Sequence, residues 1–222
     1  MGFWETTKIV LMKEDEEARD YARRLQRLLD QTPGPELEQE LDWIADRIAV
    51  GQEIKKALEK TELDGVMLKE VALNYSGGAV TLDSYLILPK VNVLVTYGEG
   101  DLKKALERSR AQMQAMQELR LRKAGWLRRW SMKLYFQEFF KPLAVVDNEV
   151  EIPKEHEGLV VSVDQLSDRL KELNRKSSAR SLPRKELEKE AQRILNAGLE
   201  NAAYYETRFR EVTSSFEGRE GR

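Results

Sequence analysis

The chain has no cysteine and only one histidine, His156, among its 222 residues. Without cysteine it has no disulfide bonds, thiolate nucleophiles or cysteine-ligated metal sites, and this composition fits a reducing cytoplasm, which is the expected location. A single imidazole excludes a histidine-rich metal centre. The sequence therefore excludes thiol enzymes and metalloproteins whose sites need cysteine or several histidines.

Long apolar runs are also missing. None approaches the roughly 20 residues that cross a bilayer, and the first residues do not show the basic and then apolar pattern of a signal peptide. The formal net charge is −2, although 34% of the residues are charged. The whole molecule is therefore not expected to attract nucleic acid, and any such binding needs a local basic patch.

Short apolar runs dominate the middle of the sequence. Strands are predicted over 66–73, 81–88, 93–97, 143–146 and 159–163, with a long helix over 102–121 and another that contains Leu166, Leu170 and Leu173. A helix before the first strand completes the order. This alternation predicts an α/β fold with a mixed central β-sheet flanked by helices.

Both ends of the chain add helices to this centre. Residues 1–50 are expected to form an N-terminal helical extension, with one helix over 14–30 and a second over 36–50 after the break at Thr32-Pro33-Gly34-Pro35. The second has Leu37, Leu41, Ile44, Ala45 and Ile48 on its apolar face. After the α/β domain (51–174) and a polar linker, a C-terminal helix is expected over 184–211, followed by a disordered tail over 214–222. The terminal helices are expected to pack on the sheet domain or on each other, and the alternative is that they form a homo-oligomer.

Three short motifs occur in order within 51–98. Gly51-Gln52-Glu53 opens a helix, Thr81-Leu82-Asp83-Ser84 lies in a predicted strand, and Val95-Thr96-Tyr97-Gly98 ends another. This arrangement resembles the nuclease-related domain (NERD) family, whose fold is that of the PD-(D/E)XK nucleases. The resemblance covers roughly residues 50–174 and implies a restriction-endonuclease-like sheet. A family glutamine in the following helix corresponds to Gln112 or Gln114.

The resemblance also implies a metal site. In such nucleases two carboxylates and a backbone carbonyl hold Mg²⁺, and a lysine orients the attacking water. Asp83 and Glu53 match two acidic positions, but Thr96 stands where the second strand carboxylate belongs and Gly98 where the lysine belongs. A hydroxyl and a glycine cannot replace these groups. We therefore expect a degenerate descendant that is not an enzyme and has no cofactor, in which Glu53 and Asp83 are remnants of the site.

A shifted site is the alternative. Asp101-Leu102-Lys103 follows the glycine-rich turn and forms an acid-x-Lys triplet, so Asp83 and Asp101 could hold Mg²⁺ while Lys103 orients water. That arrangement would make the chain an active metal-dependent nuclease. In the simpler account, Asp101 caps the next helix and Lys103 is solvated.

A basic aromatic segment follows the long helix. It contains six cations and two tryptophans without an acid: Arg120, Arg122, Lys123, Trp126, Arg128, Arg129, Trp130 and Lys133. Such a segment suits DNA or RNA, because cations pair with phosphates and aromatic rings stack on bases. It also suits a membrane surface or partner protein. A third interpretation makes its aromatics core and its arginines solvated, as the four-residue spacing of the tryptophans allows.

Overall fold

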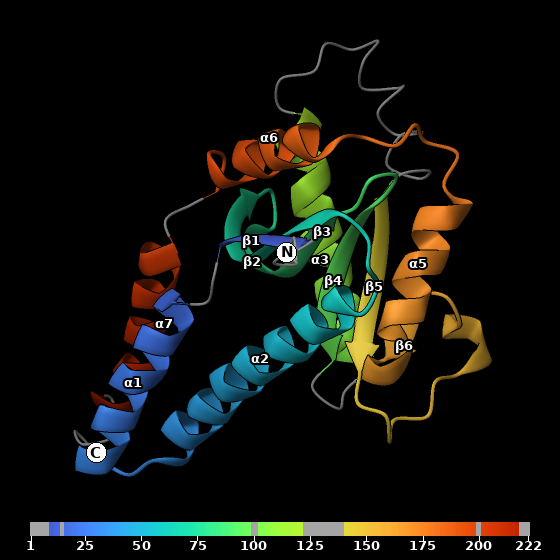
Figure 1. Cartoon of the computed structure of the whole chain (residues 1–222). Helices are drawn as coiled ribbons and strands as arrows, with labels where there is room; N and C mark the ends of the chain where they lie inside the picture. Colours follow the sequence, from blue (N-terminus) through green and yellow to red (C-terminus); the bar gives the residue numbers. More distant parts are fainter. Residues whose placement is uncertain (1–8, 14–15, 99–101, 122–139, 199–200, 218–222) are drawn as a thin grey trace, which may run out of the picture.

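The computed structural model describes residues 9–13, 16–98, 102–121, 140–198 and 201–217. Six strands form one mixed sheet in sequential order, β1 to β6 (Figure 1). The strands β2, β3 and β4 form an antiparallel meander, whereas β1 joins β2, β5 joins β4 and β6 joins β5 in parallel. Their bounds are β1 Ile9–Lys13, β2 Gly65–Tyr75, β3 Gly78–Ile87, β4 Asn92–Gly98, β5 Phe140–Val146 and β6 Val160–Ser162.

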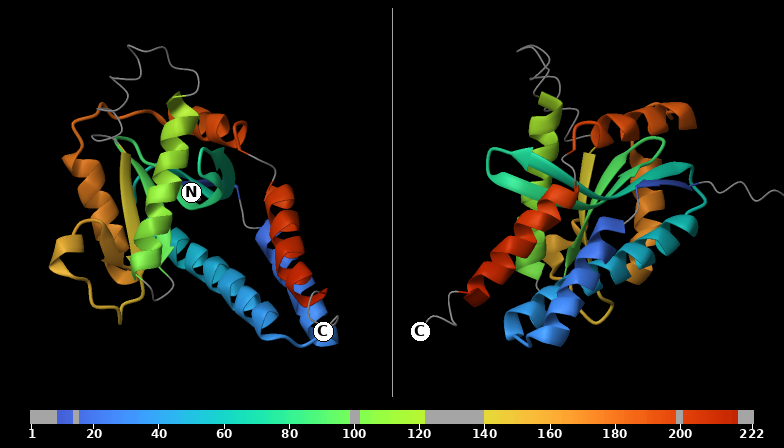
Figure 2. Two further views of the ribbon diagram at one scale, coloured as in Figure 1. Left: turned by 180° about the vertical axis from the view of Figure 1, so that it is seen from behind. Right: turned by 90° about the vertical axis from the view of Figure 1, so that its left-hand side faces the viewer.

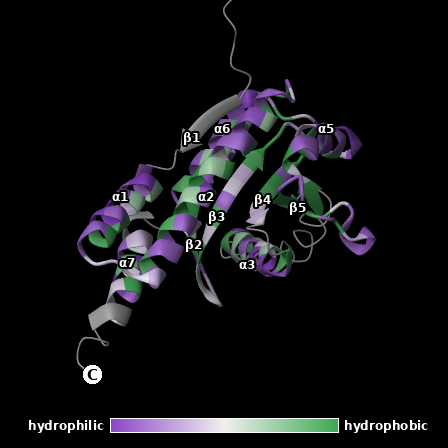
Figure 3. Ribbon diagram, turned by 90° about the horizontal axis from the view of Figure 1, so that it is seen from below, coloured by the Kyte–Doolittle hydropathy of each residue, from purple (hydrophilic) through white to green (hydrophobic). Residues whose placement is uncertain are grey.

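Helices cover both faces of this sheet. On one face α2 (Pro35–Glu59) and α5 (Leu166–Lys176) pack on apolar residues of β2 to β5, and on the other α3 (Leu102–Leu121) and α6 (Arg184–Leu195) do so (Figures 1 and 2). Apolar residues concentrate on the central strands, and the outer faces of the helices are hydrophilic (Figure 3). Two short 3-10 turns, η1 (Lys154–His156) and η2 (Val163–Gln165), flank β6.

A separate apolar cluster joins α1 (Glu16–Gln31), the first half of α2 and α7 (Asn201–Glu217). These helices lie beside the sheet rather than over its centre (Figure 1). Tyr21 of α1 stacks on Tyr205 of α7 with ring centroids 4.9 Å apart. The two ends of the chain therefore pack against each other, as one of the two sequence-based alternatives predicted.

The mixed α/β fold with additional terminal helices is confirmed, while several details differ from expectation. One helix, α2, runs through the boundary expected at residues 50 and 51, because Val50, Gly51 and Ile54 continue its buried face. The strand β1 was not predicted. The single helix expected over 184–211 is instead α6 and α7, since α6 ends at Leu195 and the chain turns through Asn196 to Gly198. Helix α7 also covers 214–217, the start of the expected tail.

Candidate functional site

The site centres on an interruption in the pairing of β2 with β3. Lys69 pairs with Ser84 and Val71 with Leu82, but Glu70 and Asp83, which lie between them, do not pair. Glu70 has a positive φ of 52°, which is uncommon for a residue other than glycine. Both carboxylates are buried. The interruption therefore directs two acidic side chains into the interior of the protein.

Both oxygens of Asp83 have cationic partners. Arg47 Nη2 of α2 lies 2.7 Å from Oδ1, and Arg108 Nη2 of α3 lies 3.1 Å from Oδ2. The first contact is a short ion pair that lacks the alignment of a hydrogen bond. The backbone N–H of Tyr97 also donates to Oδ2 at 2.9 Å. Asp83 thus ties α2, α3 and β4 together.

Arg47 bridges the two acids. Its Nε donates to Glu70 Oε1 at 3.3 Å, and the Tyr205 hydroxyl of α7 donates to Glu70 Oε2. The side chains of Arg47 and Glu70 are 3% and 6% exposed. Burial alone would lower the pKa of Arg47, but the charges of Asp83 and Glu70 outweigh burial and raise it. The guanidinium is therefore held charged between two carboxylates.

A second ion pair on the same helix joins Glu40 to Arg208 of α7. Glu40 lies seven residues before Arg47 on the buried face of α2, where it accepts hydrogen bonds from Tyr21 and Arg208. The guanidinium groups of Arg47 and Arg208 lie over the ring of Trp43, at 4.8 and 3.7 Å from its centroid. The terminal helices are thus joined to the sheet through charged and aromatic groups.

Glu53 does not take part in this cluster within the described part of the chain. It pairs with Lys56 at 2.6 Å, and its side chain is 46% exposed. The neighbouring Gly51 has a packing role instead, because a Cβ there would lie 3.0 Å from Nζ of the buried Lys69. In the helical motif of the nuclease resemblance, Gly51 therefore accommodates a lysine of β2, and Glu53 points its carboxylate to the surface.

The two departures from the nuclease pattern are packed into the interior. Thr96 Oγ1 donates to Gln112 Oε1 at 2.8 Å, and Gln112 Nε2 donates to the carbonyl of Thr81 at 2.9 Å. At Gly98 a Cβ would lie 2.8 Å from Cγ1 of Val146 and 3.2 Å from Cβ of Ala105. There is thus no room for a lysine at 98. Of the two candidate glutamines, Gln112 is buried and contacts this site, whereas Gln114 is exposed and bonds to Ser76 and Glu118.

The other candidate residues fall into two groups. Lys103 is exposed in the first turn of α3, and Arg120 near the end of α3 pairs with Glu190 and donates to the Tyr85 hydroxyl at 3.4 Å. Asp101 lies outside the described residues, and so do Arg122, Lys123, Trp126, Arg128, Arg129, Trp130 and Lys133.

The residues around Asp83 do not fit Mg²⁺. A magnesium ion needs several oxygen ligands in octahedral geometry, but two guanidinium groups already contact both oxygens of Asp83. Thr96 is bonded to Gln112. Within the described residues, no group of three or more acidic or histidine side chains is arranged to hold a metal.

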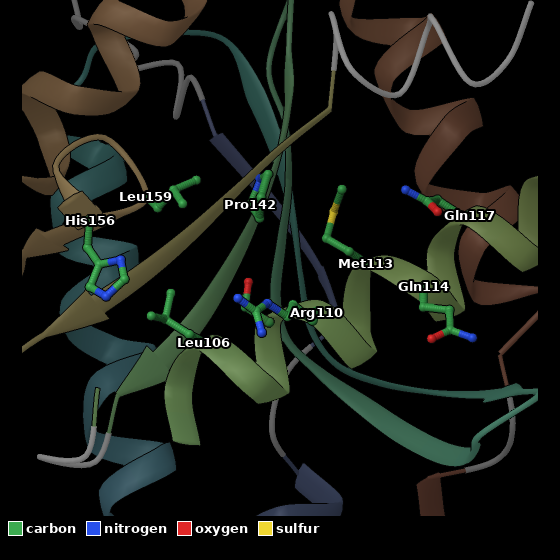
Figure 4. A pocket seen from close by; sticks show the side chains of 9 residues that line it. Leu106, Arg110, Met113, Gln114, Gln117, Pro142, His156 and Leu159 are labelled. Carbon is green, nitrogen blue, oxygen red and sulfur yellow. The ribbon is translucent and has the colours of Figure 1, made fainter. Parts of the chain in front are cut away.

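Two pockets lie away from Asp83. One, of about 400 Å³, separates α3 from the residues before β6; Met113 and Gln117 lie on one side and His156 and Leu159 on the other (Figure 4). The second, of about 390 Å³, lies between α6, the β3–β4 turn and the linker before α6. Of the candidate catalytic residues that the structure describes, Glu53, Asp83 and Lys103, none lines either pocket. Of the described helices, none combines the length and apolarity that a membrane span requires.

Sequence reasoning missed Arg47, Glu70, Arg108 and Tyr205. A signal existed for two of them. Arg47 interrupts the buried face of α2 at the spacing of Ile44 and Ile54, and Lys69-Glu70 places two adjacent charges within an apolar strand. For Arg108 and Tyr205, whose partners are distant in sequence, we find no local signal.

Comparison with protein-family models, curated proteins and solved structures finds no match to this chain. Its function is therefore argued from the geometry and electrostatics of these residues.

Proposed function

We propose that the chain is a degenerate nuclease-related domain that binds nucleic acid without hydrolysing it. The proposal that hydrolysis is lost rests on the ion pairs of Asp83 with Arg47 and Arg108. A carboxylate held by two guanidinium groups is a poor metal ligand, because the metal would have to displace both cations. The crowding at Gly98, where the family lysine would stand, supports the same conclusion.

The order of elements supports descent from a nuclease-like domain. Helix α2, the meander β2–β4, helix α3 and the parallel strand β5 follow one another as the family resemblance implied. The basic residues 120–133 supply the cations for phosphate groups and the tryptophans for bases. The cysteine-free composition is compatible with a cytoplasmic location.

A titration with labelled single-stranded DNA, duplex DNA and RNA tests this function, with and without Mg²⁺ or Mn²⁺. We expect binding that weakens as salt rises, and intact substrates in every sample. Metal-dependent cleavage that is lost in Asp83→Asn would contradict the proposal. Cleavage that is also lost in Asp101→Asn and in Lys103→Ala would place the chemistry at the shifted site, in which Asp83 and Asp101 hold the metal.

A second candidate is a protein-interaction module in which the former cleft is filled. It is favoured by the packing of α7 against the sheet, where Tyr205 bonds to Glu70. This candidate predicts no salt-dependent binding of any nucleic acid, so the same titration separates the two functions.

A further inference from the structure

The pocket beside α6 has an excess of positive charge. Four cations line it: Lys90 from the β3–β4 turn, Arg180 from the linker, and Lys189 and Arg193 from α6. Two acids, Glu186 and Glu190, also line it. Glu190 is already engaged by Arg120 and Arg193. The pocket therefore retains cationic side chains that its own acids do not neutralise.

Three of these cations are available to a ligand. Within the described part of the chain, no ion pair or hydrogen bond engages the side chains of Lys90, Arg180 or Lys189. Lys90 is partly buried, whereas Arg180 and Lys189 are exposed at the rim. Three cations face one cavity in which Glu186 is the one acid not already paired within the described residues, and this excess of positive charge favours the binding of an anion.

The backbone around the pocket is fixed by hydrogen bonds. Leu182 N–H donates to the carbonyl of Pro89 at 2.8 Å, and the Ser177 hydroxyl donates to the carbonyl of Lys90 at 2.6 Å. The side chain of Asn174 accepts from Lys90 N–H at 3.0 Å. These bonds hold the linker against the β3–β4 turn, so the cations of the two segments stay close together before any ligand arrives.

The pocket is linked to the first cation of the basic segment by an ion pair. Arg120, the first cation of residues 120–133, bonds to Glu190, which lines the pocket. The pocket also lies at the end of β4 opposite Gly98, because it is lined by Asn92, the first residue of that strand. Anion binding there would therefore be independent of Asp83.

We infer that this pocket binds a backbone phosphate of nucleic acid, through Lys90, Arg180 and Lys189. This inference rests on the proposed function and locates one of its contacts. A phosphodiester is the anion of choice because its oxygens accept hydrogen bonds from several cations at once. The exposed Leu182 at the rim offers an apolar surface to the adjoining sugar or base.

The experiment is a salt-dependent titration of fluorescein-labelled 20-nucleotide single-stranded DNA against the full chain. The double variant Arg180→Ala/Lys189→Ala should bind about tenfold more weakly. Its slope of log affinity against log salt should fall by about 0.7 for the lost phosphate contact. The variant Glu186→Gln, which removes an acid from the pocket, should bind more tightly than the natural chain.

The matched control is Lys171→Ala/Lys185→Ala, which removes the same charge from exposed positions that do not line the pocket. If the pocket variants bind like this control, the phosphate site is wrong although the proposed function stands. If the natural chain does not bind DNA, the proposed function itself fails. Charge-dependent binding to phosphatidylserine vesicles in place of DNA would overturn the inference in favour of a lipid headgroup.

Discussion

The Nη2 atom of Arg47 lies 2.7 Å from Oδ1 of Asp83, and both side chains are almost completely buried. This contact places a permanent cation against the carboxylate to which the nuclease resemblance assigned a metal. Because Arg47 also reaches Glu70, one guanidinium offsets the charge of two acids. The guanidinium of Arg47 thus occupies the position beside Asp83 where the resemblance implied a metal ion.

Replacing Arg47 with Met should destabilise the fold strongly. It leaves Asp83 with one cationic partner, Arg108, and Glu70 without the guanidinium of Arg47. Breaking a buried ion pair costs about 3–5 kcal/mol. The free energy of unfolding, from urea denaturation followed by circular dichroism, provides the measurement. Arg27→Met, at an exposed position of α1, serves as the control and should change stability by less than about 0.5 kcal/mol.

A double-mutant cycle then tests whether the pair itself is responsible. Arg47→Met combined with Asp83→Asn should cost less than the sum of the two single changes, because each single change leaves a buried charge that the other removes. Additive costs would show that the two side chains stabilise the fold independently, and would contradict the role assigned to Arg47.

The sequence predicted the order of elements from α2 to α5, because the strands are short apolar runs that differ in length and composition from the amphipathic helices around them. It did not predict the site. The apolar face expected for the helix at 36–50 included Ala45, which is exposed, whereas the buried face includes the charged Glu40 and Arg47. Burial of these charges depends on partners from the sheet and from α7, which are distant in sequence.

Introducing at position 98 the lysine that the nuclease resemblance implies should not produce hydrolysis. The side chain would begin 2.8 Å from Cγ1 of Val146, so Gly98→Lys should disrupt the contact of β4 with β5 and α3. Even Gly98→Ala should lose about 1–3 kcal/mol through overpacking. The comparison is Lys103→Ala, which alters an exposed side chain and should be nearly neutral. Metal-dependent cleavage by a folded Thr96→Glu/Gly98→Lys variant would show that the site still accepts a metal.

Two glutamines on α3 offer a matched pair of variants. Gln112→Leu removes the acceptor of the Thr96 hydroxyl and the donor to the Thr81 carbonyl. Both groups are buried, and unsatisfied buried groups cost about 1–3 kcal/mol. Gln114→Leu alters an exposed side chain and should cost less than about 0.5 kcal/mol. Thermal and urea denaturation of both variants measures the difference. Equal losses would mean that Gln112 does not hold the α3 helix on β4.

Alkaline pH should weaken the attachment of α7. Burial, followed by the charge of Glu70, raises the pKa of Tyr205 above its ordinary value. A raised pKa means that the folded state retains the phenol proton more tightly than the unfolded state. The contribution of this proton to the free energy of unfolding is therefore fully present below about pH 10, the ordinary pKa of tyrosine in the unfolded chain. It is lost as the pH rises above that value.

Tyr205→Phe isolates this contribution. The variant loses the hydrogen bond to Glu70 and should be less stable at pH 8, but its stability should fall less steeply between pH 9.5 and pH 11 than that of the natural chain. Urea denaturation across that range measures both slopes. Because lysines titrate in the same window in both proteins, only the difference between the slopes reports on Tyr205. Tyr75→Phe, which alters a partly buried tyrosine at the end of β2, provides the control. Identical slopes in the natural chain and Tyr205→Phe would show that Tyr205 does not couple α7 to the buried acid pair.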